Sequence, residues 1–184
     1  KANWQFNKDG PATDLPLIRR LLVDDGELRF RHSRKRTDIL IAVRSGAPAK
    51  DSREVPLLIN GKGKHGGQAF SVAGRVASPL KLEDPDKPYY IDLDLRAGAT
   101  RALAKGGLRG ALQLQNYDLD FTLSGPDMAL LYPLIGVAAP PTPPYRLRGR
   151  LGHEGRTWSY RDFSGRVGDS DLAGDASVET GEPR

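Results

Sequence analysis

The sequence contains no cysteine, and Met128 is the only methionine among its 184 residues. The absence of cysteine excludes disulfide bonds, thiolate zinc sites and cysteine nucleophiles. The longest apolar stretch, residues 128–139, is too short for a membrane-spanning helix, which needs about 20 residues, and Pro133 interrupts it. The three histidines are too far apart in the sequence to pair as metal ligands; they are His32, His65 and His153. We therefore expect no metal and no other cofactor.

Charge of one sign does not dominate the sequence either. The chain has 28 Lys and Arg residues against 23 Asp and Glu residues, which gives a net charge of +5 at pH 7. Such a balance permits only weak attraction to partners that carry phosphate groups. The densest cationic segment, residues 29–36, contains a single aromatic residue, Phe30. Because single-stranded nucleic acids are bound by stacking on several aromatic side chains, we expect no nucleic-acid partner.

What the sequence does contain is an alternation of apolar and polar residues with a period of two. It is clearest in five segments: residues 27–31, 91–96, 112–115, 118–124 and 145–151. Antiparallel strands with one packed face and one wet face produce this pattern. With the turn residues between them, we expect about ten short strands. The sequence predicts a mainly β fold in one domain over residues 1–184: a curved, partly open antiparallel sheet with one short α-helix.

Glycine-containing steps predict where the strands turn. Asp25-Gly26 predicts a hairpin that joins the short apolar segment before it to the strand after it. Residues 65–67 predict a second hairpin. Gly106-Gly107 predicts a turn before a further strand over residues 108–115.

One segment departs from the alternation. Asp127 can cap a short helix, and the apolar residues that follow it lie at helical spacing, which predicts a helix of two or three turns at about 127–135. The proline-rich residues 140–144 then predict an extended connector into the closing strands, residues 145–179. We expect the helix to cover one end of the sheet.

Two groups of carboxylates resemble catalytic or metal sites. Paired carboxylates are typical of glycoside hydrolases, but Asp92, Asp94, Asp118 and Asp120 alternate with apolar residues and so belong to the wet face of strands. The segment from Asp169 begins like a calcium-binding loop, yet its twelfth position is Thr180 rather than the bidentate glutamate. We therefore expect no catalytic residue, no metal site and no enzymatic activity.

Five segments in order resemble the AsmA-like family of Gram-negative envelope proteins. They are residues 22–30 with the Asp-Gly step, the central hairpin over 61–70, the helix entry over 123–131, the proline connector over 140–147 and the closing pair over 165–175. Together they span roughly residues 15–179. The resemblance implies a role in outer-membrane biogenesis and lipid homeostasis. It further implies a periplasmic protein that is anchored in the inner membrane by a segment of a longer parent.

Larger relatives in this family, including TamB-like proteins, form long sheets with an apolar groove for phospholipids. The resemblance implies that the apolar face here lines a groove for phospholipid acyl chains. The residues expected to line it are Leu28, Phe30, Ile91, Leu93, Leu95, Leu112, Leu114, Leu119, Phe121 and Leu123. The candidate contacts for anionic headgroups are Arg29, Arg31, Arg146, Arg148 and Arg150. The expected partners are thus a phospholipid or lipid-like ligand and a membrane.

Two other functions fit the same pattern. The arginine-rich face would suit a binding module for an anionic glycan or lipopolysaccharide, and the sheet could also be a purely structural β-domain. In each case the exposed edges of an open sheet predict a monomer or weak edge-to-edge association.

Overall fold

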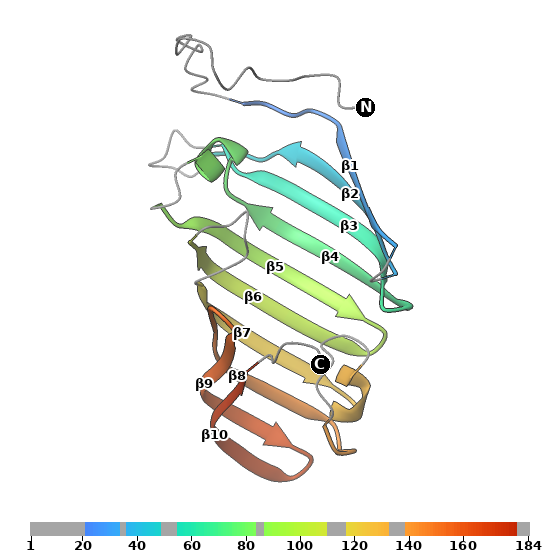
Figure 1. The fold of residues 1–184 in the computed structure, drawn as a ribbon, viewed down its shortest axis with the longest axis vertical. Helices are drawn as coiled ribbons and strands as arrows, with labels where there is room; N and C mark the ends of the chain where they lie inside the picture. Colours follow the sequence, from blue (N-terminus) through green and yellow to red (C-terminus); the bar gives the residue numbers. More distant parts are fainter. Residues whose placement is uncertain are drawn as a thin grey trace.

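The computed structural model describes residues 21–33, 36–48, 55–83, 87–109, 117–132 and 139–179. Within these residues ten strands form one antiparallel sheet, in which neighbours in sequence are neighbours in space (Figure 1). The strands are β1 (Gly26–His32), β2 (Thr37–Ser45), β3 (Leu57–His65), β4 (Gln68–Val76), β5 (Tyr89–Ala97), β6 (Thr100–Leu108), β7 (Tyr117–Gly125), β8 (Tyr145–Glu154), β9 (Thr157–Val167) and β10 (Ser170–Glu179). The predicted fold class, a mainly β and open antiparallel sheet, is confirmed.

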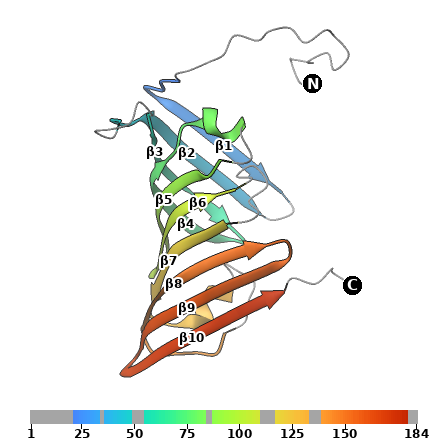
Figure 2. The same ribbon diagram turned by 90° about the vertical axis from the view of Figure 1, so that its left-hand side faces the viewer.

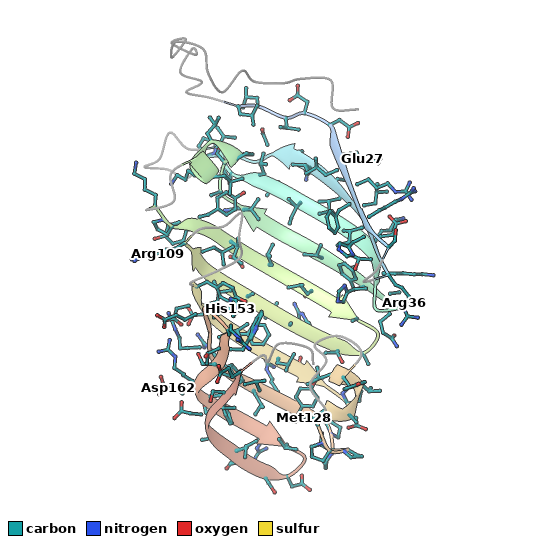
Figure 3. All side chains as sticks on the ribbon, viewed as in Figure 1. Glu27, Arg36, Arg109, Met128, His153 and Asp162 are labelled. Carbon is teal, nitrogen blue, oxygen red and sulfur yellow. The ribbon has the colours of Figure 1, made fainter. Side chains whose placement is uncertain are left out.

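The antiparallel order gives the sheet two rims of different character. One rim carries the turns β1–β2, β3–β4, β5–β6 and β9–β10 and the longer β7–β8 link, and we call it the short-loop rim. The opposite rim carries the links β2–β3, β4–β5 and β6–β7 and the β8–β9 turn. In Figure 3, Arg36 lies at the short-loop rim, whereas Arg109 and His153 lie at the opposite rim.

The molecule is long and open rather than compact. Its solvent-accessible surface is 14122 Å², whereas a compact protein of this mass would expose about 8,700 Å². The strands change direction from β1 to β10, as Figure 2 shows, because each strand is twisted relative to its neighbour. No side chain among the described residues is less than 2% exposed. The sheet therefore keeps a large part of its apolar surface close to solvent.

The predicted helix is shorter than its pattern indicated. Asp127 does cap it, but the turn that follows is a 3-10 helix, η2 (Met128–Leu131). The last third of the predicted range, residues 133–135, lies outside the described residues. A second 3-10 turn, η1 (Pro79–Glu83), joins β4 to β5 and was not predicted.

Two turn predictions were wrong. Gly106 and Gly107 lie inside β6, where a side chain at Gly106 would meet Leu119 and one at Gly107 would meet Pro88. These two glycines let neighbouring residues pack closely against β6, and they do not form a turn. Asp25-Gly26 makes no hairpin either, because the Ser45 amide donates to the Val23 carbonyl at 2.7 Å and β1 pairs with the same strand. Val23 and β1 thus lie along one neighbour, β2.

An extra residue in β9 changes the phase of its alternation. Both partners of β9 shift register at the same place, between Arg148 and Arg150 on β8 and between Gly174 and Ala176 on β10. Asp162, with a φ of 50°, lies in this bulge, and its amide donates to Asp175 Oδ1 at 2.7 Å. As a result Tyr160 and Phe163, three residues apart, share one face and stack with ring centroids 5.3 Å apart.

Candidate functional site

The apolar face of the sheet is built by the register of its strands. In an antiparallel ladder, residues directly opposite each other project from the same face. Ile91 lies opposite Gly106, and Gly106 lies opposite Leu119. The next two rows repeat this arrangement as Leu93, Ala104 and Phe121, and as Leu95, Ala102 and Leu123. Six of the predicted groove residues therefore face the same way, in three adjacent rows.

Each of these rows has a small residue in its middle. β6 contributes Ala102, Ala104 and Gly106, and large side chains flank them on β5 and β7. The side chains of β6 therefore rise less above the sheet than those of β5 and β7 on either side. Part of this region is packed: Ala104, Leu108 and Leu119 form a buried cluster against Tyr89 and Phe121, among others.

The remaining predicted groove residues are elsewhere. Leu28 and Phe30 lie on the same face, opposite Ile41 and Ile39, but at the edge of the sheet on β1. They are 62% and 55% exposed, because no described strand lies on the far side of β1. Leu112 and Leu114 lie outside the described residues. The described groove residues thus lie on one face, as the sequence predicted. Six of them lie in the middle of the sheet on β5 and β7, and two lie at its edge on β1.

An aromatic cluster on the apolar face was missed by the sequence interpretation. Tyr117, His153 and Trp158 meet at the rim opposite the short loops, with ring centroids of His153 and Trp158 4.3 Å apart. Phe121 packs edge-on to Tyr160 next to them. The break in phase between Tyr160 and Phe163 was the available signal, since a three-residue step in an alternating strand indicates a bulge.

Burial changes the chemistry of two of these tyrosines. Desolvation raises the pKa of Tyr117 to about 12 and that of Tyr160 to about 12. The Tyr160 hydroxyl donates to the Phe121 carbonyl at 3.3 Å. A phenol is neutral at physiological pH even at its ordinary pKa of about 10, and burial favours the neutral form further, so the face carries apolar bodies with uncharged polar tips.

At the short-loop rim, η2 and the connector that follows it are joined by hydrogen bonds beside the ends of β7 and β8. Asp127 Oδ1 accepts hydrogen bonds from the amides of Ala129 and Thr142, each at 2.9 Å. The Met128 amide in turn donates to Thr142 Oγ1 at 3.0 Å. Leu131 of η2 and Tyr145 at the start of β8 are buried. Figure 3 shows Met128 at this rim.

The predicted headgroup arginines lie on the opposite face from the groove residues. Arg29 alternates with Leu28 and Phe30 in β1, and Arg146 and Arg148 alternate with Leu147 in β8. A lipid whose tails lie on the apolar face could reach these side chains only around an edge of the sheet. Arg150 is also engaged, since it forms ion pairs with Asp118 at 3.0 Å and Asp120 at 3.2 Å.

The paired carboxylates form ion pairs on the polar face. Asp94 accepts from Arg101 at 2.8 Å and from Arg96 at 3.2 Å, and these bonds lower the pKa of Asp94 to about 2. The bond from Arg150 likewise lowers the pKa of Asp118. Carboxylates held ionised in this way cannot serve as general acids near neutral pH. Across the described residues, no group of three or more His, Asp or Glu side chains is placed to hold a metal ion.

The comparisons with known proteins bear on the family. No family model matches the chain, and no solved structure matches it. The chain is similar to the AsmA family protein YhjG of Escherichia coli (strain K12), with 28% identity over 211 aligned residues. This match supports an AsmA-like assignment. The resemblance inferred from the five AsmA-like segments is thereby confirmed.

The match covers very different shares of the two chains. It covers 99% of the chain and 31% of YhjG, so the chain spans less than a third of the length of this curated relative. Among the described helices, none is long and apolar enough to cross a membrane.

Proposed function

We propose that the chain is part of a Gram-negative envelope protein that acts in outer-membrane biogenesis, and that its apolar face lines a groove for phospholipid acyl chains. The longer parent would be periplasmic and anchored in the inner membrane, and this part would act without catalysis. The similarity to an AsmA family protein supports the envelope role. The observation that carries the groove is the register, which places apolar side chains of all ten strands on one face.

The one-sided sheet needs a cover for that face. Among the described residues the regular elements are one sheet and two 3-10 turns, and no second sheet packs on the first. An apolar sheet face without a second layer over it is typical of a binding surface. Acyl chains are suited to it because they are apolar, flexible and long enough to cross several strands.

The energetics favour transfer along the face over tight capture. An acyl chain of about 16 carbons gains roughly 12 kcal/mol on leaving water, at about 0.8 kcal/mol per methylene group. A bilayer already provides most of that gain. Movement of a lipid from a bilayer onto the apolar face is therefore close to neutral, which is what a conduit requires.

The experiment places a photo-crosslinking amino acid in the longer parent protein, in Gram-negative cells. We expect crosslinks to phospholipid from position 93 or 123, on the apolar face, and none from position 73. Ala73 is the matched control because it lies directly opposite Asp94, on the exposed polar face. Equal crosslinking from positions 73 and 93 would contradict the groove.

A charge in the groove should block passage without unfolding the sheet. Leu93→Lys places an ammonium group among lipid tails, at a cost of roughly 2–4 kcal/mol at bilayer depth, whereas Ala73→Lys places it in water. We expect Leu93→Lys to lower lipid crosslinking and envelope integrity while circular dichroism shows an intact β fold. If the fold survives and crosslinking does not change, the apolar face does not carry lipid and the structural role is favoured.

A further inference from the structure

On the polar face, one row of residues crosses all ten strands close to the short-loop rim. The register pairs give its members in order from β1 to β10: Arg29, Leu40, Lys62, Ser71, Arg96, Arg101, Ser124, Arg146, Arg166 and Asp171. Six of these ten residues are cations and one is an acid. We call this set the basic row.

A second row on the same face, separated from the basic row by the row that contains Asp94, is largely neutralised. Its members from β4 to β8 alternate in sign: Arg75, Asp92, Lys105, Asp120 and Arg150. Lys105 Nζ lies 3.5 Å from Asp92, and Arg150 lies 3.2 Å from Asp120. Because opposite charges that face each other across strands stabilise a sheet, this alternating row is what folding alone would favour.

In the basic row, by contrast, cations lie opposite cations. Arg96 lies directly opposite Arg101, and Arg146 lies directly opposite Arg166. Like charges at such positions destabilise a sheet. Asp94 offsets the first pair and Asp171 binds Arg166 at 3.3 Å.

Several cations at or beside the row remain in excess. Arg146 and Lys62 form no ion pair with any residue that the structure describes, and neither does Arg148, which is two positions along β8 on the same face. All three side chains are exposed. The other four cations of the row, Arg29, Arg96, Arg101 and Arg166, are each ion-paired with an aspartate. Uncompensated positive charge therefore reaches solvent at Lys62, Arg146 and Arg148, and an anion bound there would also offset the repulsion between Arg146 and Arg166.

We propose that the basic row binds a linear anionic glycan, a sugar chain that carries phosphate or carboxylate groups. Neighbouring strands lie about 4.8 Å apart, so a row across ten strands is roughly 43 Å long. Its cations stand one or two strands apart along that length. Ser71 and Ser124 lie between them. Ser71 is exposed, and the Ser124 hydroxyl, which donates to the Arg101 carbonyl at 3.5 Å, can still accept a hydrogen bond from a sugar hydroxyl.

The twist of the sheet suits the basic row to a flexible polymer as its partner rather than to a flat membrane. Each strand turns by about 20–25° relative to its neighbour, and the change in strand direction is visible in Figure 2. A planar bilayer would touch only a few members of such a row at once, whereas a flexible polymer can follow it. The row contains no aromatic side chain for base stacking, which favours a glycan over a nucleic acid.

This site is separate from the proposed groove. Residues of the basic row alternate along their strands with groove residues, as Arg96 does with Leu95, and so project from the opposite face. Substitutions in the row should therefore leave lipid crosslinking from position 93 unchanged. Failure of one proposal does not decide the other.

The test uses the full chain and a fluorescent heparin hexasaccharide, a linear glycan with sulfate and carboxylate groups, in a fluorescence anisotropy titration. We expect binding that weakens as salt is added. The double variant Arg146→Gln and Arg148→Gln should bind about three- to tenfold more weakly, since each exposed charge contact contributes modestly. The matched control, Arg150→Gln with Arg161→Gln, removes the same net charge from side chains already paired to Asp118. It should bind within about twofold of the unmodified chain.

Thermal unfolding shows whether a variant that binds the hexasaccharide more weakly is still folded. The melting temperature of the Arg146 and Arg148 variant should equal or exceed that of the unmodified chain, because opposed cations are removed. If it unfolds, the single variants Arg146→Gln and Lys62→Gln, on β8 and β3, test the same row. Equal losses in the row and control variants would overturn the proposal in favour of unspecific attraction. Tighter binding of single-stranded DNA or of anionic vesicles than of the hexasaccharide would overturn it in favour of those partners.

Discussion

Charged side chains on this sheet form ion pairs with residues of the next strand, and Asp94 shows the effect of such pairs on a pKa. It lies on β5 next to Arg101 of β6 and two residues from Arg96 of its own strand, and both guanidinium groups donate to it. An ionised carboxylate that accepts several charge-assisted hydrogen bonds resists protonation. Its pKa of about 2 is the expected result.

Asp94 should stabilise the fold only where it is ionised. Its pKa is about 2 in the folded chain and about 3.9 in an unfolded one, so its contribution is complete above about pH 4 and is lost as pH falls toward 2. We expect Asp94→Asn to lower the free energy of unfolding at pH 7 by up to about 1 kcal/mol, because its ion pairs are partly exposed. Urea unfolding at several pH values measures this.

The variant and the unmodified chain should converge in stability as pH falls from about 4 to about 2. A double-mutant cycle with Arg101→Gln isolates the pair, since both single changes remove the same contact. A stability difference that does not depend on pH would show that Asp94 acts through packing and not through its charge.

At the scale of elements, glycine and the bulge shape the sheet. Gly165 has a φ of 156°, and a side chain there would collide with the Arg146 carbonyl of the neighbouring strand. Gly74 has the same φ and a similar conflict with the Asp92 carbonyl. Both lie on the apolar face, opposite Leu147 and Leu93. Glycine at such positions lets a strand bend and a large neighbour lie over it, so the curvature of the sheet is encoded in these steps.

The link between η2 and the proline connector depends on one side chain. Asp127→Ala removes an acceptor that serves two amides, those of Ala129 and Thr142. Loss of such a cap costs about 1 kcal/mol, and leaving two part-buried donors unpaired adds to it. We expect the free energy of unfolding to fall by about 1–2 kcal/mol, as chemical denaturation would measure.

Asp127→Asn is the control for this change, because it keeps an Oδ1 acceptor in the same place. It should retain most of the stability that Asp127→Ala loses. If both variants lose the same amount, the negative charge of Asp127 matters more than the hydrogen bonds.

At the scale of the whole molecule, the sheet is long and has two free edges among the described residues. β1 and β10 each pair with a single strand. Every residue of β10 is exposed, and Leu172 and Val178 are 41% and 42% exposed. An unpaired strand of this kind is a template for pairing with another chain.

We expect weak, concentration-dependent association of this chain through such an edge. Sedimentation velocity over a range of protein concentrations measures it. Leu172→Lys places a charge on the apolar side of β10 and should shift the chain toward monomer, because charged edge strands resist pairing. Ala73→Lys adds the same charge on β4, away from both edges, and should not. A chain that stays monomeric at the highest concentrations would show that these edges do not drive association.

Which residues share a face was predictable from the sequence alone. The alternation in residues 27–31, 91–96, 118–124 and 145–151 identified four strands and sorted their side chains into an apolar and a polar set. The physical reason is local: successive side chains of a strand point to opposite faces. The resemblance to AsmA family proteins was also predictable from the sequence, and the match to YhjG supports it.

Which residues lie in the same row was decided by the tertiary structure. A slip of two residues between strands keeps every apolar side chain on the apolar face but gives every charge a new partner, so alternation cannot reveal the register. The pairing of Arg150 with Asp118, 32 positions apart, and the opposition of Arg146 and Arg166 depend on that register. The exact position of the bulge at Asp162 depends on it as well, because the step from Tyr160 to Phe163 indicates an extra residue but only the two partner strands show where the register shifts. The sequence therefore determined the composition of each face, and the strand pairing determined the arrangement of charges on it.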